Sequence, residues 1–199
     1  MVNLAQTTRT SDFDSSDEEF EEEHQMPLQV SWLGLAVVNC HQLLGICALP
    51  EDLKSYNIQN VFVLCTKGEM VKYRVPSLLE SYQQKGFTVY HYPFPDGSVP
   101  DIASCWKILE ELRICLENGK KTLIQCYGGL GCSCLIAACL LLQLSDTMLP
   151  EEAIDLLREL RGAGAIQTVK QYNYLHDFRD NVATYLATKE DSACRSVSR

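Results

Sequence analysis

The stretch that decides the fold is TLIQCYGGLGCSCLIAACLLLQL, residues 122–144. It contains a short apolar strand, a glycine-rich turn and then a segment, 132–144, that is apolar on nearly every face of a helix. Such a turn leaves several backbone N–H groups at the positive end of the helix dipole. Gly128, Gly129 and Gly131 allow backbone angles and a close approach that side chains would block. The stretch therefore predicts a phosphate-binding loop between a buried strand and a central helix.

The side chains of this loop indicate which phosphate chemistry it serves. A nucleotide-binding loop needs Lys-Ser or Lys-Thr after its last glycine, where this chain has Cys132-Ser133, and a dinucleotide-binding turn needs a glycine where Cys134 stands. Cys126 takes the first position, where the dipole and N–H groups that bind phosphate also lower the pKa of a thiol. Most cysteines in apolar surroundings are small buried hydrophobes, but the position of Cys126 favours a nucleophile.

Outside this stretch, periodicity predicts strands and helices in alternation, which is typical of one α/β domain with a mostly parallel sheet flanked by helices. A capping box is expected from Ser98 to Asp101, at the start of an amphipathic helix that runs to about Asn118. The expected strands cover 28–33, 43–47, 60–65, 87–92 and 122–124, and the other expected helices cover 51–56, 76–85, 132–144, 150–161 and 168–188.

Composition excludes several classes of function. The formal net charge of −9 argues against binding to nucleic acids or anionic membranes. The longest apolar run, Cys134–Leu142, is far shorter than the roughly 20 residues of a membrane span. The ten cysteines follow no secretory signal pattern, so a cytoplasmic or nuclear location is expected, with most of these thiols packed in the core.

The domain organisation is predicted from shifts in composition. Residues 1–26 are acidic and poor in aromatic side chains, so we expect a disordered tail, followed by one domain over 27–188 and a flexible end over 189–199. Ser15 and Ser16 each have Glu three positions later, which would suit an acid-directed kinase. The same composition is equally consistent with a solvated tail in which neither serine is phosphorylated.

The loop resembles the His-Cys-x-x-Gly-x-x-Arg-Ser/Thr signature of protein tyrosine and dual-specificity phosphatases, which Cys126, Gly129 and Ser133 match. Four further segments extend the likeness over nearly the whole chain. They are similar to the kinase-associated phosphatases, a dual-specificity family, and read YRVP at 73–76, DIAS at 101–104, GAIQT at 164–168 and QYNYL at 171–175.

This resemblance implies a phosphatase fold, a mechanism and a partner. Cys126 would form a cysteinyl-phosphate, Ser133 would ease its breakdown, and Asp96 would protonate the leaving oxygen and later activate water. The substrate would be the activation-loop phosphothreonine of a phosphorylated cyclin-dependent kinase, with phosphotyrosine as a second class, and no metal or cofactor is implied. Loop amides would hold the phosphoryl oxygens, from Tyr127, Gly128, Gly129, Leu130, Gly131, Cys132 and Ser133.

Two roles remain open on the residues alone. Asp96 before Gly97 is also a common turn residue, although its place in the matching loop favours catalysis. Gln167 or Gln171 would position the hydrolytic water, or else both are exposed residues at the start of a helix. Asp101 is better explained as the partner of Ser98 in the capping box.

The chain departs from the signature at two positions. Cys132 replaces the arginine that grips two phosphoryl oxygens, and Gln125 replaces the histidine before the nucleophile. These changes predict either a weakened phosphatase or a non-catalytic, kinase-binding pseudophosphatase. A basic segment of the resembling family is also absent between Pro50 and Glu51.

The three thiols of the loop allow two further readings. Cys132 or Cys134 would act as a resolving thiol for an oxidised Cys126. Zinc binding is less expected, because the three cysteines lack paired C-x-x-C geometry.

Overall fold

The sheet has five strands in the order β1-β2-β5-β3-β4. The computed structural model describes residues 29–49 and 53–197, with side chains described as far as Glu190. β1 pairs antiparallel with β2, and all other neighbours are parallel, which confirms the α/β class and the mostly parallel sheet. The strands are β1 (Ser31–Gly34), β2 (Leu43–Cys47), β3 (Asn60–Val63), β4 (Thr88–His91) and β5 (Thr122–Gln125).

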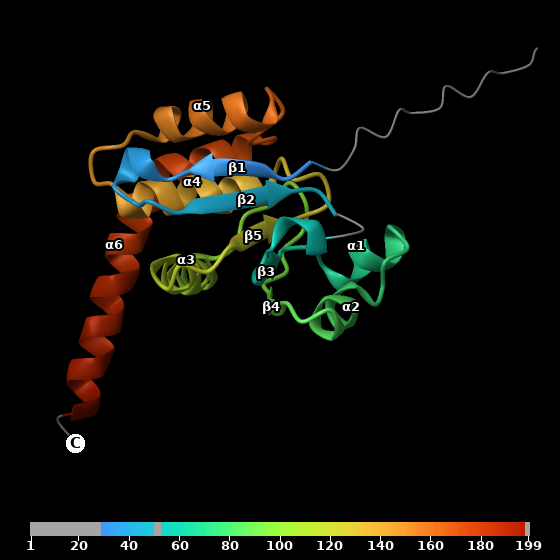
Figure 1. Cartoon of the computed structure of the whole chain (residues 1–199). Coiled ribbons are helices and arrows are strands. Elements are labelled where there is room, and N and C mark those ends of the chain that lie inside the picture. Colours follow the sequence, from blue (N-terminus) through green and yellow to red (C-terminus); the bar gives the residue numbers. More distant parts are fainter. Residues whose placement is uncertain (1–28, 50–52, 198–199) are drawn as a thin grey trace, which may run out of the picture.

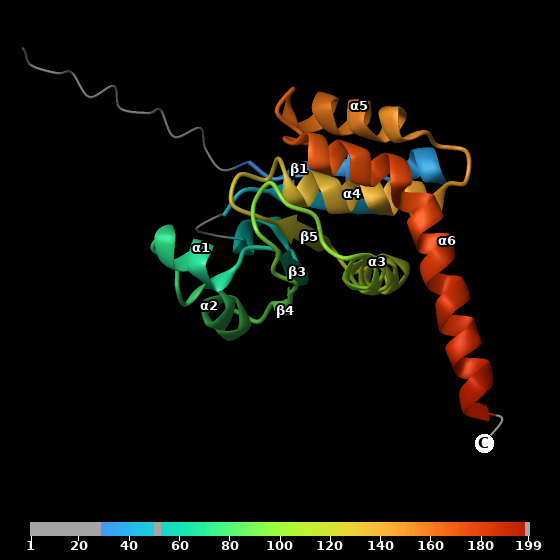
Figure 2. The same ribbon diagram turned by 180° about the vertical axis from the view of Figure 1, so that it is seen from behind.

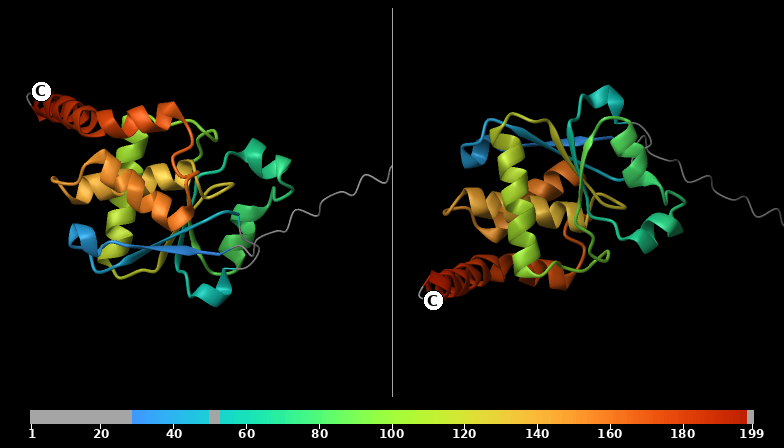
Figure 3. Two further views of the ribbon diagram at one scale, coloured as in Figure 1. Left: turned by 90° about the horizontal axis from the view of Figure 1, so that it is seen from above. Right: turned by 90° about the horizontal axis from the view of Figure 1, so that it is seen from below.

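Helix α4 lies at the centre of the helical layer, against β2 and β5 and between the other large helices (Figures 1 and 3). Every residue from Cys132 to Leu142 is buried, as expected of a helix that is apolar all round. Figures 1 and 2 show α5 at the top of the molecule, and α1 and α2 on the side away from α6. The described helices are α1 (Lys67–Lys72), α2 (Leu78–Gln84), α3 (Ile102–Glu117), α4 (Cys132–Leu144), α5 (Pro150–Arg161), α6 (Val169–Val197) and the 3₁₀ turns Ala36–Val38 and Lys54–Tyr56.

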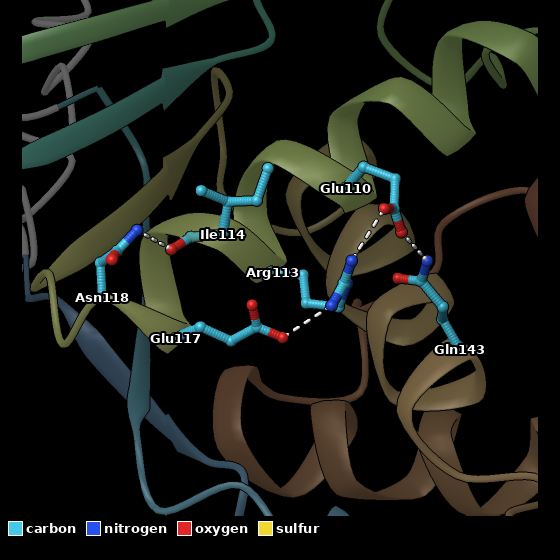
Figure 4. Close-up of polar contacts among 6 residues, drawn as sticks. All are labelled: Glu110, Arg113, Ile114, Glu117, Asn118 and Gln143. Carbon is cyan, nitrogen blue, oxygen red and sulfur yellow. Dashed lines mark hydrogen bonds and ion pairs between the residues drawn. The ribbon is translucent and has the colours of Figure 1, made fainter.

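Polar contacts fasten α3 to α4 at the surface (Figure 4). Gln143 of α4 donates from Nε2 to Glu110 Oε1 at 2.9 Å. Arg113 bridges Glu110 at 3.0 Å and Glu117 at 2.7 Å, along one face of α3. These exposed pairs contribute little individually, so buried packing, rather than charge, sets the position of α3.

The predicted capping box from Ser98 to Asp101 is wrong. Asp101 is itself the N-cap of α3, and its Oδ1 accepts the Ser104 backbone N–H at 2.9 Å. Hydrogen bonds from Ser104 therefore hold the pKa of the Asp101 carboxyl below its ordinary value. Ser98 instead accepts a hydrogen bond from Lys170 Nζ at 3.1 Å. Asp101, rather than Ser98, caps the helix because it lies directly before the first helical residue, where its carboxylate oxygens reach the free N–H groups of the first turn.

Three element predictions need correction. The last helix was expected to end at Thr188 and runs to Val197, because a helix that has formed gains one backbone hydrogen bond for each residue that it adds. Figures 1 and 2 show this part of α6 projecting beyond the sheet. The expected helix over 51–56 is a 3₁₀ turn at Lys54–Tyr56 within the described part. Helix α1 was missed, although Thr66 and Glu69 form the capping box that marks its start.

The expected acidic tail, Ser15, Ser16 and the junction of Pro50 with Glu51 lie outside the described residues. Among the residues described, no helix combines the length and apolar character needed to cross a bilayer.

Candidate phosphate-binding site

Cys126 follows directly after β5, the central strand, and lies buried where the chain turns into α4. The loop thus begins at the carboxyl end of a strand flanked by parallel neighbours, where ligands of open α/β sheets bind. The predicted phosphate-binding residues all lie in this loop or in the first turn of α4, namely Tyr127, Gly128, Gly129, Leu130, Gly131, Cys132 and Ser133.

Backbone donors from outside hold two loop carbonyls. The Leu49 N–H donates to the Tyr127 carbonyl, and the Ile166 N–H donates to the Leu130 carbonyl, both at 3.2 Å. In a planar trans peptide the N–H points opposite to the C=O. The N–H groups that follow these two carbonyls, of Gly128 and Gly131, therefore point away from Leu49 and Ile166.

Arg161, the last residue of α5, binds the carbonyls of Gly128 and Gly129, which lie between those of Tyr127 and Leu130. Its Nη2 donates to the Gly128 carbonyl at 3.3 Å and its Nε to the Gly129 carbonyl at 3.2 Å. Its Nη1 reaches Ser31 Oγ of β1 at 3.1 Å. The sequence analysis missed this residue, because an arginine at the end of a helix carries no local sign of a contact about 30 residues away.

Glycine is required at one loop position and closely packed by a side chain at another. Gly129 has φ +65°, and a Cβ there would lie 2.6 Å from the Cys47 carbonyl carbon. At Gly131 a Cβ would lie 2.5 Å from Gln167 Oε1. Gln167 is exposed and lies against the loop, whereas Gln171 is fully buried and donates to the Ser98 carbonyl at 3.2 Å. Gln167 is therefore the better placed of the two glutamines for a role at the loop, and Gln171 is not an exposed residue.

Asp96 lies on the exposed loop between β4 and α3, close to the first residue of α4. The Cys132 sulfur lies 3.9 Å from Asp96 Oδ1 and 3.8 Å from the Pro95 carbonyl oxygen, and its single proton can be donated to either. Glu69 of α1 accepts the Asp96 backbone N–H at 2.8 Å. The fold thus brings the predicted acid and the predicted phosphate loop together, and Glu69, which the sequence analysis also missed, fixes the backbone of the acid.

The start of α6 holds the other side of the Asp96 loop. Thr168 Oγ1 donates to the Gly97 carbonyl at 2.9 Å, and Gln171 and Lys170 contact Ser98. The acid loop is consequently fastened from both flanks, largely by side chains.

Buried thiols surround Cys126. Burial, reinforced by the negative charge of an ionised Cys126, raises the pKa of Cys65 and of Cys134 to about 12. The same causes, with the charge of Asp96, raise the pKa of Cys132 far above its ordinary value. Cys132 therefore remains a neutral thiol and supplies no positive charge in place of an arginine. In the described part of the chain, no group of three His, Cys, Asp or Glu side chains is arranged to hold a metal ion.

Two buried polar groups beside Cys126 lack a hydrogen-bond partner. Ser133 Oγ has none, and Gln125 has none at Nε2 although its Oε1 accepts from Tyr82 Oη at 3.1 Å. An unpaired buried polar group typically costs about 1–3 kcal/mol. Ser133 Oγ, in the first turn of α4, is therefore a buried hydroxyl with no protein partner among the described residues.

The exposed rim of the loop is aromatic. The Tyr127 ring leaves the loop and stacks on Tyr73, with ring centroids 3.6 Å apart and planes at 10°. Lys72 Nζ lies 5.4 Å from the Tyr73 ring centroid. The rim thus offers apolar surface and positive charge to whatever carries the phosphate.

The model of the family described as cyclin-dependent kinase inhibitor 3 matches residues 3–154. The chain belongs to this family. The Homo sapiens cyclin-dependent kinase inhibitor 3 is 60% identical over 206 residues, which cover 96% of this chain and 97% of the human protein. That aligned stretch is longer than the 199 residues of the chain, so the human protein carries residues that this family member lacks. The sequence analysis expected such a gap after Pro50.

Solved structures support the same fold. A crystal structure of a kinase-associated phosphatase, with its catalytic-site cysteine replaced by serine, is 60% identical and matches with a TM-score of 0.77, covering 80% of this chain and 98% of that one. The active form of the phosphatase Tk-PTP is 27% identical with a TM-score of 0.61, covering 69% of this chain and 91% of that one. The expected phosphatase fold and family resemblance are confirmed.

Proposed function

We propose that this family member is a cysteine-dependent dual-specificity phosphatase of weak turnover, acting on the activation-loop phosphothreonine of a cyclin-dependent kinase. The observation that carries the proposal is that the loop after β5, which begins with Cys126, lies next to the loop after β4, which carries Asp96. Donors from the surrounding protein hold the carbonyls of Tyr127, Gly128, Gly129 and Leu130 outward. The carboxylate of Asp96 lies 3.9 Å from the thiol of Cys132, at the start of the helix behind that loop.

The reaction would proceed in two steps. The Cys126 thiolate attacks phosphorus, and Asp96 gives its proton to the leaving serine, threonine or tyrosine oxygen. Water then attacks the cysteinyl-phosphate, Asp96 takes a proton from it, and the thiolate leaves. The loop amides neutralise the phosphoryl oxygens throughout, and Gln167, which lies against Gly131, is the residue best placed to orient that water.

The expected reduction in the rate of phosphate release follows from Cys132, which replaces the arginine of the signature. An arginine that stabilises a transferring phosphoryl group is worth roughly 10³–10⁵ in rate. A neutral thiol in its place leaves only the loop amides and the helix dipole. Gln125 adds to the loss, because its amide carries no charge to stabilise the thiolate.

The partner is proposed from the relatives. The human relative is named a cyclin-dependent kinase inhibitor, and the similar crystal structure is of a kinase-associated phosphatase. Cysteines at the nine positions that the structure describes are all free, which fits the reducing cytoplasm and nucleus, where we propose that the protein acts.

The test is phosphate release from a phosphothreonine peptide of a kinase activation loop. We expect slow release by the unaltered protein, none by Cys126→Ser, and a loss of about 10²-fold in Asp96→Asn, the size typical of general acid catalysis. Release no higher than that of the Cys126→Ser protein would reject catalysis.

A second candidate is a pseudophosphatase that binds the phosphorylated kinase without hydrolysis. It is favoured by Cys132, a neutral thiol where the phosphatase signature has arginine, because the loop then lacks the cation that stabilises a transferring phosphoryl group. It predicts association with the phosphorylated kinase at micromolar concentration, lost on dephosphorylation of the kinase, with no phosphate released.

A further inference from the structure

Arg161 stands out among the charged side chains near the site. Its guanidinium is half-buried, and among the described residues no carboxylate lies within ion-pair distance of it. Its partners are instead oxygens of two separate segments. They are the carbonyls of Gly128 and Gly129 in the loop, and Ser31 Oγ with the Gln29 carbonyl at and just before the start of β1. A planar fork with several donors suits such divergent acceptors.

The contacts determine the direction of two loop amides. The Gly128 carbonyl shares a peptide plane with the Gly129 N–H, and the Gly129 carbonyl shares one with the Leu130 N–H. Because the peptide is planar and trans, holding each carbonyl toward Arg161 turns the N–H of the same plane the opposite way. The two neighbouring amides, of Gly128 and Gly131, depend on backbone donors instead, since Leu49 and Ile166 hold the preceding carbonyls.

Close packing around Gly129 strengthens the case. An ideal Cβ at Gly129 would lie 2.7 Å from Arg161 Nη2 and 2.6 Å from the Cys47 carbonyl carbon. The guanidinium and the end of β2 therefore confine this glycine, which has φ +65°. Donors that are already held in place need little reorganisation when an anion binds.

Resting on the proposed function, we propose that Arg161 is a positioning residue of the phosphate site, which turns the Gly129 and Leu130 N–H groups toward the bound phosphoryl oxygens. It acts through the loop backbone and does not touch phosphate. Its importance is greater in this chain because Cys132 contributes no cation, so the amides carry the recognition of the anion.

The experiment uses the full chain with Cys126→Ser, which prevents turnover, and a phosphothreonine peptide as the probe. Arg161→Met is compared with Arg113→Met, which removes the same charge from the surface of α3, where Arg113 pairs with Glu110 and Glu117. We expect Arg161→Met to weaken peptide binding by calorimetry about 10-fold or more, Arg113→Met to change it by less than about 2-fold, and Arg161→Lys to restore part of the loss.

An NMR titration of the same proteins separates positioning from general destabilisation. Adding the peptide to the Cys126→Ser protein should shift the amide signals of the whole loop. In Arg161→Met, the responses of Gly129 and Leu130 should be reduced selectively, while those of Gly128 and Gly131 persist. Equal loss at all four amides, or undiminished binding by Arg161→Met, would overturn this role and leave the proposed function standing. No binding by the Cys126→Ser protein itself would overturn both.

Discussion

The loop after β5 and the loop after β4 meet at the site but are held in different ways. Backbone amides and Arg161 fix the carbonyls of the first loop, which is largely buried. The second loop is more exposed, and the side chains of Glu69, Thr168, Lys170 and Gln171 hold it. The groups of the first loop that would bind an anion are backbone amides, so a change of the Cys132 side chain leaves them in place, whereas loss of Arg161 would release two of them. An acid held by side chains depends on a few separate contacts.

The largest expected effect tests whether the first loop is intact. Cys132→Arg should raise phosphate release from the phosphothreonine peptide by on the order of 10³-fold, because the fork would again grip two phosphoryl oxygens. Initial rates at saturating peptide measure this. No gain in a folded Cys132→Arg protein would mean that the loop backbone is not prepared for phosphate, which would break the comparison.

The second prediction concerns a substitution that disturbs the backbone conformation of the same loop. Gly129→Ala should lower the free energy of unfolding by about 3 kcal/mol, because its Cβ meets the Cys47 backbone and its φ is positive. Gly128→Ala is the matched control, since nothing lies within 4 Å of a Cβ there. Urea unfolding of both variants measures this difference. Similar losses of unfolding free energy in Gly129→Ala and Gly128→Ala would contradict the prediction.

The third prediction concerns pH and the thiol of Cys134 behind the loop. Burial raises its pKa from 9.0 to about 12, so above pH 9 the unfolded chain loses this proton while the folded chain keeps it. The stabilisation is complete below pH 9 and is lost as pH rises toward 12, by about 1.4 kcal/mol per pH unit. Unfolding by urea in reductant at pH 8.5 to 10.5 should show a smaller decline in Cys134→Ala. Parallel curves for the two proteins would refute this.

The smallest expected effect sharpens the description of the second loop. Glu69→Ala should lower the maximal rate of phosphate release about 5-fold, because one hydrogen bond of about 1 kcal/mol no longer fixes the Asp96 backbone. Thr66→Ala removes the other half of the capping box without touching Asp96 and costs about 1 kcal/mol of stability. Equal rate losses in both variants would show that the capping box, and not the contact with Asp96, is responsible.

Strongly patterned segments were predictable from the chain alone. Helices α4 and α5 begin and end at the predicted residues, Cys132–Leu144 and Pro150–Arg161, because an apolar run and a proline at the first turn are local signals. The start of α3 was misassigned because Ser98 and Asp101 are both good caps. The choice between them was decided by the folded structure, in which the helix begins at Ile102, directly after Asp101.

The sequence by itself determined the phosphate loop, since glycines, a following helix and Cys126 at its first position are local features. It also determined the absence of the signature arginine and histidine. Only the tertiary structure decided which distant groups orient this loop and its acid. Arg161 and Glu69 act across separations of 27 to 33 residues, and such contacts exist only once α5 and α1 have taken their places in the tertiary structure. A local pattern specifies how a segment folds, but packing determines what its side chains reach.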